Sequence, residues 1–323
     1  MRRAALLVLL ALAVVAGGTV LYGIRAYDQP GPLPAASAVM VPHGGMDQVA
    51  DALVQRGVVG SPRLLQAASL VTRGDGAIRA GELEFPAGAS LRQVLQVLRT
   101  GKPVQHHVTI PEGLTAAQVA ALLDRTPILE GGPVLPAEGG LLPETYLFER
   151  GTTRAALAER ATKAMERALD RAWAARSPTL PLDTPRAVLI LASIVERETA
   201  KPEERPRVAA VFLNRLRQGM KLQSDPTVVY GASGGTGVLD HGLTRAELDR
   251  NDPYNTYRIP GLPPGPISMP GAAALRAVTQ PAQSDELFFV ADGTGGHVFA
   301  RTQDEHLRNV ARWREVERAR KQP

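Results

Sequence analysis

The sequence predicts an α+β protein with an N-terminal transmembrane helix, a small βα module and a larger mixed α+β domain. Three observations predict it. They are an uncharged N-terminal run, recurring short strand–turn–helix units, and a C-terminal part in which helical patterns precede a hairpin pattern. At 323 residues the chain has room for about two domains, and a hydrophobic content of 44% can fill their cores.

The N-terminal run extends from Ala4 to Ile24 and follows Arg2 and Arg3. At about 1.5 Å per residue it is long enough to span a bilayer core. The basic flank favours an N-terminus inside the cell. A cleaved signal peptide is the alternative, but the run exceeds the roughly 7–15 residues of a signal core and no clear small-x-small site follows. We therefore expect residues 1–27 to form a short cytoplasmic stub and a single-pass anchor in the inner (cytoplasmic) membrane, with its N-terminus inside and the catalytic domain periplasmic or otherwise extracytoplasmic.

Residues 28–37 are rich in proline and small side chains, which predicts a semi-extended linker. Between 38 and 104 a short strand, a Pro-x-Gly turn and an amphipathic helix occur twice, with the turns at 42–44 and 86–88. A third copy has its turn at 111–113 and predicts a helix over 116–123. Strand–helix repeats of this size resemble a LysM-type module, a fold known for binding the N-acetyl sugars of cell walls. Short βα repeats also occur without a carbohydrate role, so sugar binding and a spacer role both remain open.

Residues 105–323 are expected to form one mixed α+β domain. Thr184 and Pro185 are an N-cap followed by proline at the first helical position, and the helix they begin is apolar almost all round, so it should be buried. The patterns predict helices over 153–177, 186–200 and 204–218, and a hairpin with strands 287–291 and 297–300.

Composition excludes several function classes. The net charge of +5 is dispersed, and no basic run is interleaved with aromatic residues, so nucleic-acid binding is not expected. The absence of cysteine excludes disulfides, thiolate nucleophiles and cysteine-ligated zinc. The six histidines lack His-Glu-x-x-His spacing, and neither a Gly-x-Ser-x-Gly elbow nor a phosphate-binding glycine loop occurs. We predict no metal and no cofactor.

Two glutamates near the end of the buried helix are the strongest candidates for chemistry. A buried carboxyl has a raised pKa and can donate a proton near neutral pH, as glycosidic cleavage requires. Helical spacing directs Glu196 and Glu198 to nearly opposite sides. Glu196 shares its side with the small Ser193, whereas Glu198 is predicted to face the core and pair with an arginine. The alternative is that both carboxylates only form salt bridges.

Several polar segments of the same domain could line a cleft or merely connect elements. Tyrosine rings can stack on sugars, and amide or carboxylate groups can bind hydroxyls. The candidate residues in these segments are Gln223, Asp225, Tyr230, Tyr254, Asn255 and Tyr257.

Several segments in order resemble the YceG-like endolytic murein transglycosylases. They are EGGLLPETY (138–146), ASIVERETA (192–200), VFLNRLRQGMKLQSDPTVVYG (211–231), YNTYRIPGLPPGPI (254–267) and FFVADGTGGHVFARTQDEH (288–306). The order of anchor, LysM-like module and catalytic domain is similar too, so the resemblance covers essentially the whole chain.

The resemblance implies a lyase that cleaves the β-1,4 bond between N-acetylmuramic acid and N-acetylglucosamine within nascent peptidoglycan strands. The products would carry 1,6-anhydro ends, which would terminate elongation. The implied partners are glycan strands and the peptidoglycan synthases called penicillin-binding proteins. It implies that Glu196 is the catalytic acid, and that the other site residues, Ser193, Glu198, Glu144 and the polar candidates above, contact substrate. A water-using muramidase, with Glu144 or Asp225 as second carboxylate, and a non-enzymatic wall-binding scaffold are the alternatives.

Overall fold

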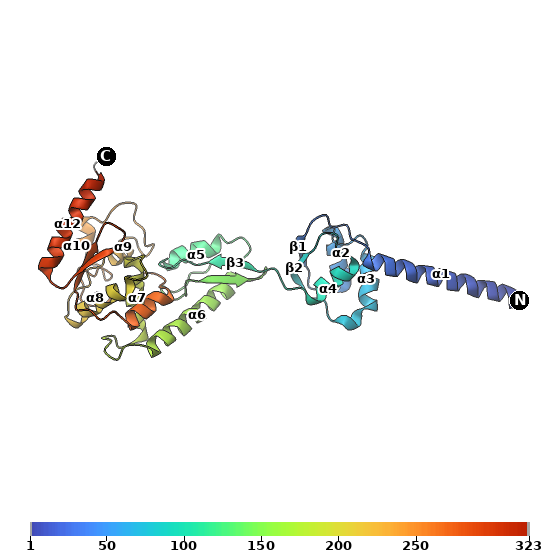
Figure 1. Ribbon diagram of the computed structural model, residues 1–323, viewed down its shortest axis with the longest axis horizontal. Helices are drawn as coiled ribbons and strands as arrows, with labels where there is room; N and C mark the ends of the chain where they lie inside the picture. The colour runs from blue at the N-terminus through green and yellow to red at the C-terminus, as the bar shows by residue number, and fades with distance from the viewer. Residues whose placement is uncertain (1, 322–323) are drawn as a thin grey trace. The chain divides into compact units, whose positions relative to one another are not determined.

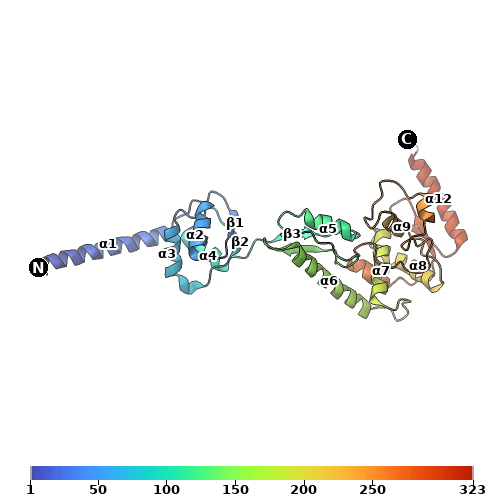
Figure 2. The same ribbon diagram turned by 180° about the vertical axis from the view of Figure 1, so that it is seen from behind.

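The computed structural model describes residues 2–321, which divide into two compact units (Figures 1 and 2). The first unit comprises the chain up to His106 together with Leu147–Arg150, and the second comprises His107–Tyr146 and the chain from Gly151 onward. The assignment of Leu147–Arg150 to the first unit had no signal in the sequence. The guanidinium of Arg150 donates to Glu82 of that unit at 3.0 Å.

The first unit starts with the apolar helix α1 (Arg2–Asp28), which by length and composition could cross a membrane from Leu9 onward. Strands β1 and β2 pair antiparallel, and their inward side chains pack against α2 and α4 in one apolar core. The elements after α1 are β1 (Ser37–Val41), α2 (Met46–Gln55), α3 (Pro62–Val71), the short 3-10 helix η1 (Arg73–Asp75), β2 (Gly81–Phe85) and α4 (Leu91–Thr100).

Two features of this unit differ from expectation. The segment predicted as a linker is attached to the unit, because the Gly31 amide donates to the Gly88 carbonyl at 3.1 Å and Leu33 is buried. Two helices separate β1 from β2, where the repeat pattern predicted one. The Ser61 hydroxyl caps the unexpected helix α3, and Pro62 is at its first position. The same combination of a hydroxyl N-cap and a proline at the first helical position occurs at 184–185, where it predicts α7 (Pro185–Glu198).

The second unit is mainly helical, with one pair of strands in the early part of its sequence and another near its end. Its elements are β3 (His106–Thr109), α5 (Ala116–Asp124), β4 (Thr145–Phe148), α6 (Arg154–Ala174), α7 (Pro185–Glu198), α8 (Arg205–Arg217), α9 (Asp225–Ala232), α10 (Arg245–Asp249), α11 (Ala272–Thr279), β5 (Phe288–Ala291), β6 (His297–Ala300) and α12 (Gln303–Lys321). β3 pairs with β4, and β5 pairs antiparallel with β6.

Helix α7 is the centre of the second unit (Figures 1 and 2). It packs against α6, α8 and α11, and nearly every side chain from Val188 to Glu196 is buried among them. The predicted cap at Thr184, the helices equivalent to α6, α7 and α8, and the hairpin are confirmed. Helices α9, α10, α11 and α12 were not predicted; α9 begins at Asp225 within a predicted loop, and α12 follows the hairpin. Burial of α7 fixes the end of that helix in the unit's interior.

Candidate active site

The two candidate glutamates occupy the last turn of α7, which ends at Glu198 because Thr199 adopts an extended conformation (φ −138°, ψ 132°). The Thr199 hydroxyl donates to Glu204 at 3.1 Å and is held just before α8. The end of α7 therefore places the carboxyl groups of Glu196 and Glu198 next to residues that are distant in the sequence.

Glu196 is enclosed by an ion-pair cluster. Its side chain is only 3% exposed, and one oxygen accepts from the Arg205 guanidinium at 2.7 Å while the other accepts from the Gly271 amide at 2.9 Å. Arg205 also contacts Glu112 at 2.9 Å. Burial raises the pKa of Glu196, and the Gly271 amide and Arg205 oppose that rise. Both carboxylate oxygens are engaged by buried donors.

Glycine at 271 leaves room for the Glu112 side chain. A Cβ there would lie 1.8 Å from a carboxylate oxygen of Glu112, so a larger residue would force that side chain to move. The amide of Gly271, the N-cap of α11, can therefore approach Glu196 directly. This contact makes the cluster part of the packing between α7 and α11.

Glu198 lies in a different environment. Its side chain lines a cavity of about 390 Å³ and is partly exposed. The Ser224 hydroxyl donates to it at 2.5 Å. Burial raises the pKa of Glu198 to about 7, helped by the charge of Asp225 and opposed by the Ser224 hydrogen bond and by Arg215. This carboxyl is thus protonated in a large fraction of molecules near neutral pH and opens to a space that a ligand can enter.

The cavity is lined by both polar and apolar residues. Asp225 accepts from the Tyr257 hydroxyl at 2.6 Å, and the backbone of Gln223 has the left-handed φ of 51°. A non-glycine residue in this region is uncommon and is often found at functional sites. The full lining is Glu198, Arg215, Leu222, Gln223, Asp225, Tyr257, Phe289, Val290, His306 and Val310. Polar groups beside an aromatic and apolar wall suit a sugar ring.

The predicted orientation of the two glutamates is therefore reversed. Glu196 forms the buried arginine pair that was expected for Glu198, and Glu198 faces the cavity that was expected for Glu196. Helical projection alone could not decide this, because the partners come from α8, α11 and the segment before α9. Four predicted site residues meet at the cavity: Glu198, Gln223, Asp225 and Tyr257.

The other predicted contacts lie elsewhere. Ser193 is fully buried and bonds to Ile190 and Ile267, and the Asn255 amide donates to three backbone carbonyls of residues 247–250. Tyr230 and Tyr254 form a separate aromatic pair with centroids 4.8 Å apart. Glu144 is an exposed residue whose carbonyl accepts from Ile110. None of these residues lines the cavity at Glu198.

Sequence reasoning missed several lining residues. Arg215 comes from α8 and His306 from α12, and the His306 ring stacks on Phe288 with centroids 5.1 Å apart. The apolar pattern of the predicted hairpin could have indicated its lining residues Phe289 and Val290. Helix α12 is so polar that its pattern does not predict a packed helix, and its lining residues had no such signal. Within residues 2–321 no group of three or more His, Asp or Glu side chains is arranged to hold a metal ion.

Comparisons with known proteins agree on one family. The model of the YceG-like family matches residues 39–312. A protein of Streptococcus pneumoniae named endolytic murein transglycosylase is 32% identical over 284 residues, covering 72% of this chain and 50% of the relative. The chain thus spans about half the length of that relative. A Bacillus subtilis protein of the same name is 27% identical over 330 residues, covering 91% and 89%.

A solved structure supports the same relationship. The crystal structure of a YceG-like protein from Listeria monocytogenes matches with a TM-score of 0.54 and 26% identity. The match covers 84% of this chain and 98% of that one. Sequence and fold comparisons therefore point in the same direction.

Proposed function

Since the chain belongs to the YceG-like family, we propose that it is a peptidoglycan lytic transglycosylase, a carbon–oxygen lyase that cuts within glycan strands. Its relatives in Streptococcus pneumoniae and Bacillus subtilis are named endolytic murein transglycosylases. The observation that carries the proposal is Glu198, a carboxyl with a pKa of about 7 that lines a cavity together with polar, aromatic and apolar side chains. Such a group is a proton donor at the pH of the cell wall.

We assign the role of general acid to Glu198 rather than Glu196. A proton donor must reach the glycosidic oxygen at about 2.6–3.2 Å. Glu198 borders the cavity, whereas both oxygens of Glu196 are already bound to Arg205 and Gly271 in the interior. Glu196 then serves to fix the helix end and the start of α8.

The reaction that fits one acid is an internal displacement. Protonated Glu198 gives its proton to the bridging oxygen as the bond from C1 of N-acetylmuramic acid to that oxygen breaks. The same carboxylate then takes the proton of the muramic C6 hydroxyl, whose oxygen forms the new bond to C1. A 1,6-anhydro end results and no water is consumed, so a second catalytic carboxylate is unnecessary.

A water-using muramidase is the alternative that one observation favours, because Asp225 lies in the same cavity as Glu198. The two mechanisms give products that differ by one water. We expect mass spectrometry of digested sacculi to show anhydro ends. Reducing ends in their place would indicate hydrolysis, and no release of fragments would indicate a non-enzymatic scaffold.

The decline of activity at high pH should follow the deprotonation of Glu198. Because the acid must be protonated and burial raises its pKa to about 7, kcat/KM should be flat below that pH and decline above it. Ser224→Ala removes a hydrogen bond that lowers this pKa, so the decline should move to higher pH. The rate of anhydro-end release should be measured across pH 5–9 for the unaltered protein and for Ser224→Ala. A decline that is unchanged in the variant would argue against Glu198 as the titrating group.

The first unit is proposed to hold the enzyme at the membrane and to bind the wall. We propose that α1 is a single-pass anchor in the inner membrane with its N-terminus inside, which leaves the second unit in the periplasm. Nascent strands as substrate imply proximity to peptidoglycan synthases of the penicillin-binding class. Cross-linking at the membrane followed by mass spectrometry should recover such a synthase, and its absence would count against this partner.

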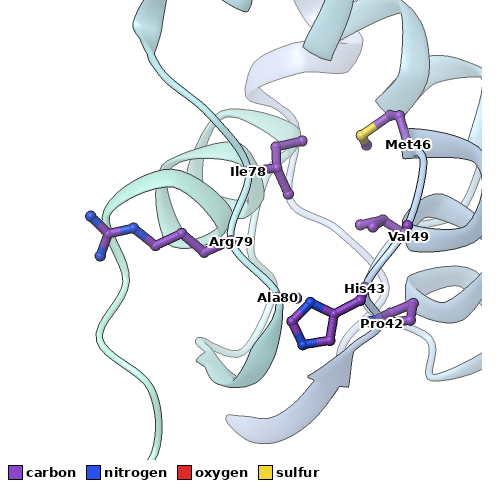
Figure 3. Close-up of a pocket in the computed structure, with 8 residues that line it drawn as sticks. Pro42, His43, Met46, Val49, Ile78, Arg79 and Ala80 are labelled. Carbon is purple, nitrogen blue, oxygen red and sulfur yellow. The ribbon is translucent and has the colours of Figure 1, made fainter.

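A cavity in the first unit is the proposed LysM-like sugar site. Its volume is about 260 Å³, and it begins at the first Pro-x-Gly turn. Figure 3 shows Met46, Val49 and Ile78 directed toward a common space beside His43, while the Arg79 side chain extends away from it. His43→Ala should weaken binding to insoluble sacculi several-fold, and His107→Ala is the matched control, since His107 is an exposed histidine outside this cavity. Equal binding of both variants and the unaltered protein would leave this unit a spacer.

A further inference from the structure

Helix α3 carries large apolar side chains that the core of the first unit does not use. Leu65 is its buried residue, whereas Leu70 is 67% exposed and Val71 is 85% exposed. Ala67 is also exposed on the outer side of the helix. An apolar patch at a helix end indicates a surface that is covered in the cell.

The same helix borders an apolar groove shared with α1. The groove has a volume of about 410 Å³; Val20, Gly23 and Ile24 of α1 line it on one side, and Leu64, Ala67 and Val71 of α3 on the other.

The end of α1 is firmly attached to the unit. Asp28 accepts from the Arg92 guanidinium at 2.6 Å, and that guanidinium lies 4.7 Å from the centroid of the Tyr27 ring. Tyr27 also packs against the apolar core. The helix therefore enters the unit through fixed contacts, and the position of α3 beside α1 is defined.

The position of α3 beside α1 determines how deep α3 lies relative to the membrane surface. The apolar span of α1 includes Val20 and Ile24, and at 1.5 Å per residue Val20 lies about 6 Å deeper along the helix than Ile24. Side chains that face Val20 and Gly23 across a groove lie at a similar depth. Arg63 before the patch and Arg73 after it are exposed, as is Arg25 of α1, and cations at this level can contact lipid phosphates.

We infer that α3 is an interfacial helix, whose residues Leu70 and Val71 insert among the acyl chains of the outer leaflet and whose groove with α1 is filled by lipid. This inference rests on the anchor role proposed for α1. It makes the membrane a binding partner of the first unit itself, beyond the single spanning helix.

The absence of cysteine allows a direct test with single labels on the full chain. Val71→Cys, Leu21→Cys and Met40→Cys would each carry an environment-sensitive fluorophore. The labelled chains would be placed in phosphatidylethanolamine–phosphatidylglycerol vesicles with brominated acyl chains. Leu21 is in the apolar span, and Met40 is exposed on β1 outside the groove. All three side chains are exposed, so folding should be unaffected.

The label at position 71 should be quenched nearly as strongly as that at 21 and several-fold more than that at 40. Quenching at 71 that equals the value at 40, with strong quenching at 21, would overturn the inference while leaving the anchor intact. Absence of quenching at 21 would overturn the anchor and the inference together. A disulfide-linked dimer formed by the unlabelled Val71→Cys chain under an added mild oxidant, together with no quenching of the labelled chain, would identify a second copy as the occupant and would also overturn it.

Discussion

Glu198→Gln is expected to lower the release of anhydro products from sacculi by roughly 10²–10⁴-fold, the usual contribution of a general acid. The amide can still accept the hydrogen bond from Ser224, but it has no proton of suitable acidity to give to the glycosidic oxygen. Because the side chain borders a cavity rather than filling the core, the variant should remain folded. Product release by mass spectrometry and thermal unfolding should be measured on the same preparation.

The difference in stability between this variant and the unaltered protein should depend on pH in a defined direction, because only the unaltered protein carries the titrating Glu198. The folded pKa of about 7 is raised from an ordinary value of 4.5, so the folded state binds the proton more tightly. Stability is therefore unaffected by this group below about pH 4.5 and declines as the pH rises toward 7. Above pH 7 the loss is complete, at about 3 kcal/mol for the full shift. Glu198→Gln should thus melt higher than the unaltered protein at pH 8, but not at pH 4.

Glu203→Gln is the matched control, since Glu203 is an exposed glutamate outside the cavity. It should cut sacculi at the normal rate and melt at the normal temperature. A Glu198→Gln variant that cuts as fast as this control would refute the assignment of the acid.

Glu196→Gln is expected to be a folding variant, with a loss of about 3 kcal/mol in the free energy of unfolding. Two buried donors, the Arg205 guanidinium and the Gly271 amide, each use one carboxylate oxygen. An amide offers a single oxygen, so one donor loses its acceptor, and Arg205 keeps only the partly exposed Glu112 as an ionic partner. Urea unfolding at pH 7 measures the loss.

Activity per folded molecule should decline far less in Glu196→Gln than in Glu198→Gln. The comparison requires the folded fraction to be determined at the assay temperature, because the variant is destabilised. If Glu196→Gln is stable and inactive while Glu198→Gln is active, the catalytic acid is Glu196, as the sequence alone had suggested.

The sequence predicted elements that depend on local signals. The cap at Thr184, proline at 185 and an all-round apolar pattern were enough for α7, and the Gly-rich turn at 293–296 was enough for the hairpin. Helix α3 has the same kind of cap at Ser61. It was not predicted, because the repeat pattern of one strand followed by one helix leaves no place for a second helix before β2. Helix α12 has no continuous apolar stripe, so periodicity could not reveal it.

The candidate site was predictable as a set of residues but not as a geometry. The cavity contains one of the two candidate glutamates and three of the six residues chosen from polar segments. Which glutamate faces it depends on Ser224, Arg205 and Gly271, which lie 26, 9 and 75 residues away in the sequence from their carboxylate partners. Contacts of that range arise from tertiary packing, about which a helical wheel carries no information.

The backbone of Gln223 has a consequence for laboratory evolution. A left-handed conformation costs a residue with a Cβ about 1 kcal/mol or more relative to glycine, and Gln223 adopts it with φ 51° at the cavity wall. A library selected only for heat resistance should therefore become enriched in Gly or Asn at 223. A library selected for growth on an intact wall should retain Gln if its side chain contacts the glycan. Sequencing the two populations would show whether Gln223 is retained for activity at a cost in stability.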